Sequence, residues 1–139
     1  MKLAFYYDTE EDFYPFDYFI KTNIDNCKIL GSNRKKQIKS DLIEKIETIR
    51  ENRGFPVEGI SGPLKGYKFN KIKQAKNENT LFRVLYYNYK GFVILLDGFE
   101  KPREYSGKKE ERKIKKHYER ASFYCENIKK DFYKHIKEA

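Results

Sequence analysis

Two apolar segments, residues 81–87 and 92–96, lie on either side of a short turn and constrain the fold more than any other part of the chain. They read LFRVLYY and FVILL, and their β-branched and aromatic residues are typical of strands. Gly91, in the turn between them, can supply the positive φ that a tight hairpin requires. The pattern therefore predicts a β-hairpin. Within its first strand, the two-residue period places Arg83 on one face with Leu85 and Tyr87. The cation therefore projects from a rigid sheet and not from a loop.

The N-terminal part of the chain predicts one strand and two helices. Alternation of apolar residues predicts a strand over residues 2–8. A run of acidic residues followed by Pro15 is typical of a helix start, because acids are favourable there and proline is tolerated in the first turn. Ser32 or Asn33 can cap a second helix, whose apolar positions recur at three- and four-residue steps up to Ile49. We expect these two helices to pair as a hairpin.

The C-terminal part predicts two more elements. Glycines and prolines interrupt residues 54–63, which we expect to be irregular. Residues 66–74 read as a strand that places Lys71 and Lys73 on one face. From residue 109 onward, apolar positions as far as Ile136 mark one face of a long helix.

The element order is therefore β-α-α-β-β-β-α. It predicts a single domain over residues 1–139 with an α+β fold, in which a small, mainly antiparallel sheet packs against an N-terminal helical hairpin and a C-terminal helix.

Positive charge is concentrated outside the N-terminal segment. The chain has 30 Lys and Arg against 21 acids, a net charge of +9. Residues 1–32 carry three lysines and six acids, a net charge of −3, so the remaining residues carry +12. This distribution favours a polyanionic partner such as nucleic acid, although a lysine-rich, solubilising surface explains charge alone equally well.

The two cysteines are far apart in sequence and have no metal-ligand spacing, so neither a disulfide nor a zinc site is expected. No segment approaches the ~18 apolar residues of a membrane span, and the N-terminus lacks an apolar leader. A cytoplasmic protein without membrane contact is expected.

Several cations are candidates for binding a phosphate. Lys71, Lys73 and Arg83 can converge across neighbouring strands. The alternative is that the two lysines only protect an edge strand from aggregation. Lys101 and Arg103 flank Pro102, which would fix them rigidly at the rim of the sheet, or they belong to an ordinary basic turn.

Two further sets of residues are candidates for contacting RNA. Tyr105, in a basic loop, could stack on a nucleobase. Arg120 and Tyr124 lie four residues apart on one side of the C-terminal helix and could reach a substrate. Packing and an ion pair explain this second pair as easily.

The order of these segments resembles the RelE/ParE toxin superfamily, and most of all its HigB-like, phage-derived branch. The matching motifs, in chain order, are Leu64 to Gly66, Arg83 with Tyr86, Leu95 to Lys101, and Arg120 with Tyr124. The chain departs from the family pattern at three positions: Asp97 stands where a histidine is common, Pro102 replaces a second lysine, and His117 replaces a small alanine.

The resemblance implies the toxin of a type II toxin–antitoxin system, an endoribonuclease that would cleave mRNA on the ribosome without metal or cofactor. The ribose 2′-hydroxyl would attack the adjacent phosphodiester and leave a 2′,3′-cyclic phosphate. Lys71 or Lys73 would act as base or electrostatic anchor, Arg83 would stabilise the phosphorane, and Lys101 would hold the phosphate or protonate the leaving oxygen. Arg103, Tyr105, Arg120 and Tyr124 would contact RNA, and an antitoxin would cover the basic surface.

Two alternatives remain open from the sequence. The chain could be a ParE-like, non-catalytic inhibitor of DNA gyrase that keeps the same fold. It could also be a phage nucleic-acid-binding protein with a decayed catalytic site, which the departures at Asp97 and Pro102 make plausible.

Overall fold

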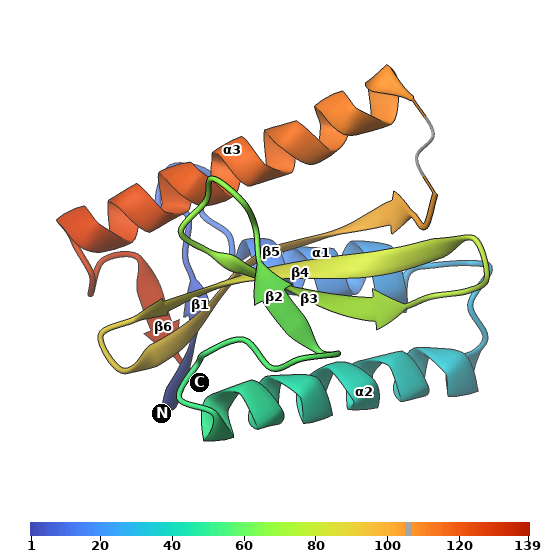
Figure 1. Cartoon of the computed structure of the whole chain (residues 1–139), viewed down its shortest axis with the longest axis horizontal. Coiled ribbons are helices and arrows are strands. Elements are labelled where there is room, and N and C mark those ends of the chain that lie inside the picture. Colours follow the sequence, from blue (N-terminus) through green and yellow to red (C-terminus); the bar gives the residue numbers. More distant parts are fainter. Residues whose placement is uncertain (105–106) are drawn as a thin grey trace.

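The computed structural model describes residues 1–104 and 107–139 and has an α+β fold built on one six-stranded sheet (Figure 1). The strand order is β2-β3-β4-β5-β1-β6. In chain order the strands are β1 (Lys2–Tyr6), β2 (Ser61–Pro63), β3 (Asn70–Ala75), β4 (Thr80–Tyr89), β5 (Phe92–Pro102) and β6 (Ile136–Glu138). β1 and β5 pair in parallel and the other neighbours are antiparallel, so the first strand is inserted between β5 and β6 in a mainly antiparallel sheet.

Helices cover both faces of this sheet. They are α1 (Pro15–Phe19), which continues into a π-helical turn η1 (Ile20–Asp25), then α2 (Ser32–Glu51) and α3 (Lys108–Lys130). Figure 1 shows α3 along one side of the sheet and α2 along the opposite side. α1 packs mainly on β5 and α2 on β3, so each contacts the sheet more than it contacts the other helix. Among the described residues, no helix combines the length and apolar character needed to cross a membrane.

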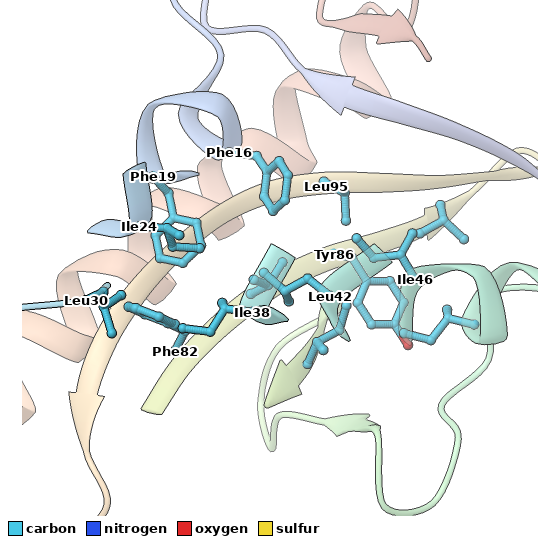
Figure 2. Packing of buried hydrophobic residues seen from close by; sticks show 14 residues of the cluster. Phe16, Phe19, Ile24, Leu30, Ile38, Leu42, Ile46, Phe82, Tyr86 and Leu95 are labelled. Atoms are coloured by element: carbon cyan, nitrogen blue, oxygen red, sulfur yellow. The ribbon is translucent and has the colours of Figure 1, made fainter. Parts of the chain in front are cut away.

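Alternation along the strands divides the core into two layers. On the α1/α2 face, Phe82 and Tyr86 of β4 pack with residues of both helices (Figure 2). On the α3 face, Leu85 and Tyr87 of the same strand pack with residues of α3. The predicted face of Arg83 is confirmed, because it lies between Phe82 and Val84 in a strand whose even-numbered residues up to Tyr86 point to the other layer.

The central hairpin is confirmed and is longer than predicted. β5 continues to Pro102, so that Asp97 lies inside the strand and Lys101 is paired with Leu81. The register shifts by one residue where Leu85 pairs with Asp97 and the next residue of β4 pairs with Leu95. This β-bulge leaves Leu96 without a partner and lets Asp97 share the α3 face. Sequence alternation alone cannot reveal such a shift.

The chain ends differently from the prediction. α3 ends at Lys130, and the last residues form β6, which pairs with β1. Phe132 and Ile136 fit a helical period, but they pack in the α3-side core from a turn and a strand. β6 pairs with the edge of β1 that faces away from β5, where the backbone groups of β1 would otherwise be unpaired.

The bounds of β2 and β3 also differ from the prediction. Ser61–Pro63, expected to be irregular, forms β2 against β3. The strand expected from residue 66 starts at Asn70, because Gly66 adopts a positive φ of 85° in the preceding turn.

Candidate functional site

The four cations proposed as catalytic lie on the same face of the sheet. Lys73 is directly opposite Arg83, and Lys71 is directly opposite Leu85 on the same pair of strands. On the other side of β4, Lys101 is directly opposite Leu81. Since opposite residues of an antiparallel pair point to the same face, all four side chains project on the α3 side. Lys71, Lys73 and Arg83, which the sequence predicts can converge, therefore share one face, and Lys101 lies on that face as well. We call the four residues the cationic cluster (Lys71, Lys73, Arg83 and Lys101).

Arg83 is the buried centre of this cluster. Its exposed fraction is 9%, and its Nη1 donates a hydrogen bond to the hydroxyl of Tyr118 in α3. Its Nε is buried without a hydrogen-bond partner. Among the described residues, no carboxylate forms an ion pair with Arg83. A buried guanidinium normally has an acidic partner, so this one retains a positive charge that no acid neutralises among the described residues.

Burial and mutual repulsion lower the pKa of two lysines in the cluster. The pKa of Lys71 is lowered by burial and then by the charges of Arg83, Lys73 and Lys101. The pKa of Lys101 is lowered by burial and by Arg83 and Lys73. Both shifts have the sign that a lysine acting as a general base requires.

A hollow of about 190 Å³ adjoins the cluster at the β2 edge of the sheet. Lys71 and Lys73 line it from β3, and residues 59–62 line it from β2 and the turn before it. Glycines at positions 59 and 62 keep this wall free of bulky side chains, and an added Cβ at either would meet nothing within 4 Å. The hollow therefore has room for a group that the lysines can contact.

Lys101 and Arg103 are both engaged with backbone carbonyls. The Nζ of Lys101 donates to the carbonyl of Pro102 at 2.9 Å. The Nε of Arg103 donates to the carbonyl of Asn77 at 2.9 Å, which ties the end of β5 to the β3–β4 turn. Arg103 is exposed and so has donors left for RNA, whereas the predicted stacking residue Tyr105 lies outside the described residues.

Arg120 and Tyr124 occupy different environments. Tyr124 is 2% exposed and stacks on Tyr6 with ring centroids 4.0 Å apart. Its ring is inside the core, so of the two roles that the sequence allows for Tyr124 the structure favours packing over contact with RNA. Arg120 is exposed on α3 and lines a hollow together with Asp97 and His117.

Sequence reasoning missed two contacts that α3 makes with the sheet. One is the hydrogen bond from Arg83 to Tyr118. The other joins His117 to Asp97, with Nδ1 and Oδ2 3.0 Å apart. In the sequence, Asp97 and His117 stand out only as departures from the family pattern. Their separation by 20 positions gives no local pattern that would pair them.

Comparisons of the chain with family models, with curated proteins and with solved structures find no match. Among the described residues, no group of three or more His, Cys, Asp or Glu side chains is placed to hold a metal ion. What the site does must therefore be inferred from its own chemistry.

Proposed function

We propose that this protein is a HigB-like toxin that cleaves mRNA. The observation that carries the proposal is the buried Arg83, which has an unpartnered Nε, no ion-pair partner among the described residues, and three lysines on the same face of the sheet. A phosphodiester would supply the missing negative charge. Donors aimed at developing charge in a site with little water stabilise a transition state more strongly than they would in bulk solvent.

In this proposal each residue of the cationic cluster has its own role in RNA cleavage. Arg83 stabilises the phosphorane formed when a ribose 2′-hydroxyl attacks the neighbouring phosphorus. Lys71, whose pKa is lowered, takes the proton of that hydroxyl, and Lys73 anchors the phosphate beside it. Lys101 protonates the leaving 5′-oxygen, so the products are a 2′,3′-cyclic phosphate and a free 5′-hydroxyl.

The partners follow from the same surface. A basic face suits mRNA in the ribosomal decoding site, where phosphates surround the substrate. An antitoxin with acidic segments would neutralise the toxin by covering the cluster, because complementary charge speeds and orients association.

Expression of the Arg83→Ala variant tests this function. We expect loss of growth inhibition and of mRNA cleavage, measured by primer extension after induction, with an unchanged circular dichroism spectrum. Lys36→Ala is the matched control, because it removes an exposed positive charge from α2, outside the cluster. A folded Arg83→Ala variant that cleaves mRNA as the wild type does would refute the proposal.

The same experiment separates the other functions. Growth inhibition with an SOS response and intact mRNA would identify a gyrase inhibitor. RNA binding without cleavage or growth inhibition would identify a nucleic-acid-binding protein with a decayed site.

A further inference from the structure

Asp97 and His117 form a hydrogen-bonded pair outside the cationic cluster. The Asp97 side chain is 7% exposed; its Oδ1 accepts the N–H of Gly98 at 2.8 Å and its Oδ2 lies 3.0 Å from Nδ1 of His117. A carboxylate accepts hydrogen bonds, so Nδ1 of the histidine carries the proton. The His117 ring also stacks on Phe99, with centroids 4.5 Å apart. Its position is thus fixed by two contacts.

This arrangement leaves the other ring nitrogen available. With Nδ1 donating to Asp97, Nε2 is an acceptor whenever the imidazole is neutral. Among the described residues, none forms a hydrogen bond with Nε2, and the His117 side chain is 29% exposed. The acceptor can therefore be reached by a ligand that donates a hydrogen bond.

The pair lines a hollow of about 280 Å³ between α1, β5 and α3. β1 pairs with β5 only as far as Leu95, so the edge of β5 beyond that residue faces this space. Phe13 and Tyr18 form an aromatic wall, with their rings edge to face at 5.7 Å. Tyr18 is 61% exposed, so its ring has a free side on which a planar base can stack.

Charges around the hollow are largely paired. Glu100 pairs with Lys76, and Glu110 lies 3.7 Å from Lys113. Arg120, one helical turn beyond His117, also lines the hollow and forms no ion pair with the described residues. The polar groups that line the hollow without an ion-pair partner among the described residues therefore include the Arg120 guanidinium and the Asn23 amide, and Nε2 of His117 lies beside them.

We propose that this hollow binds one ribonucleotide, and that His117 recognises its ribose 2′-hydroxyl. The base stacks on Tyr18, the hydroxyl donates to Nε2 of His117, and Arg120 binds a phosphate oxygen. A 2′-hydroxyl is what distinguishes RNA from DNA at a given position. The inference rests on the proposed function, because it gives an RNA-cleaving protein a second contact that selects RNA, separate from the cluster that cuts it.

Mononucleotides test this site without any cleavage, because they contain no phosphodiester. The full chain is titrated with uridine and adenosine 5′-monophosphates and with their 2′-deoxy counterparts, and backbone amide NMR shifts are recorded. We expect shifts at Tyr18, His117 and Arg120, and about fivefold tighter binding of the ribonucleotides, as one neutral hydrogen bond provides.

Variants assign the preference to one side chain. His117→Phe retains an aromatic ring against Phe99 and should reduce the ribose preference to about one. Arg120→Gln should weaken the binding of ribonucleotides and deoxyribonucleotides equally and leave the ribose preference unchanged. Lys36→Ala should change neither the affinity nor the preference. The ligand series on the wild type stands independently if the phenylalanine variant proves unstable in a thermal melt.

The outcomes separate this inference from the proposed function. Equal binding of the two sugars, shifts confined to Lys71 and Lys73, or a ribose preference retained in folded His117→Phe would each overturn the inference while leaving cleavage at Arg83 intact. A ribose preference that depends on His117, in a protein without nuclease activity, would support the inference and refute the nuclease.

Discussion

Lys73 and Arg83 lie directly opposite one another on neighbouring antiparallel strands, and among the described residues neither forms an ion pair with an acid. Like charges at this position repel, and the guanidinium is also buried. The fold thus retains an arrangement that costs stability and that an anion would relieve. Sites of this kind are where function and stability are expected to conflict.

The Arg83→Met variant should therefore be more stable than the wild type and inactive. Methionine fills a similar space without a charge, and replacing a buried, incompletely partnered ion by an apolar side chain stabilises by about 1–4 kcal/mol in favourable cases. The loss of the Tyr118 hydrogen bond offsets part of this gain. Urea denaturation and an mRNA cleavage assay measure the two effects. Lower stability than the wild type would show that Arg83 has a structural role.

The cleavage rate should depend on pH through Lys71 and Lys101. As general base Lys71 must be neutral and as general acid Lys101 must be protonated, so the rate should rise with pH through the pKa of Lys71 and fall through that of Lys101. Because burial and neighbouring cations lower the pKa of both lysines, both limbs of this profile should lie below the ordinary lysine value of 10.5. Lys73→Met removes a charge that lowers both pKa values and should move both midpoints to higher pH.

The same shift has a consequence for folding. Since the folded-state pKa of Lys71 lies below the unfolded value, unfolding takes up protons between the two, and the free energy of unfolding should rise with pH through that window. The control for both measurements is Lys36→Met, which alters charge outside the cluster. A rising limb whose midpoint is the same in Lys73→Met would argue against Lys71 as the base.

The sequence predicted the features that depend on local periodicity. Alternation in residues 81–87 was sufficient to place Arg83 on a defined face, because the side-chain period of a strand is a property of the backbone alone. The same argument placed Lys71 and Lys73 beside it, since a hairpin aligns same-face residues of its strands.

Features that depend on how elements meet were not predictable in this way. The bulge that places Asp97 on the α3 face depends on the pairing of β5 with β4. The contacts of His117 and Tyr118 depend on where α3 crosses the sheet. Phe132 fits a helical period but packs beyond the end of α3, because pairing with the free edge of β1 competes with further helix.

Tyr124 should matter for stability and not for RNA cleavage. Its ring is buried against Tyr6, so Tyr124→Ala should cost about 3–5 kcal/mol in the free energy of unfolding. Its hydroxyl is 3.5 Å from Oδ2 of Asp8, too far for a strong hydrogen bond, so Tyr124→Phe should cost less than about 1 kcal/mol. Urea denaturation measures both. A Tyr124→Phe variant that is stable but fails to cleave RNA would restore this residue to the site.

Gly98 should be intolerant of any side chain, because α1 packs directly on the backbone of β5 at this position. A Cβ at residue 98 would lie 2.4 Å from the ring of Phe19, which is itself 2% exposed and cannot move aside freely. Overpacking of this kind costs about 1–3 kcal/mol, so Gly98→Ala should lower the midpoint of urea denaturation. It should also disturb the neighbouring Asp97, whose carboxylate accepts the N–H of residue 98.

Gly62→Ala is the matched control for this substitution, since a Cβ there meets nothing within 4 Å and the φ of Gly62 is not positive, and its effect should stay within about 0.5 kcal/mol. Shortening the opposing ring tests the cause. Phe19→Leu destabilises the wild type by leaving a void, but in the Gly98→Ala background it should cost less, because the added methyl occupies part of that void. Strictly additive effects of the two substitutions would show that the ring of Phe19 is not what excludes a side chain at Gly98.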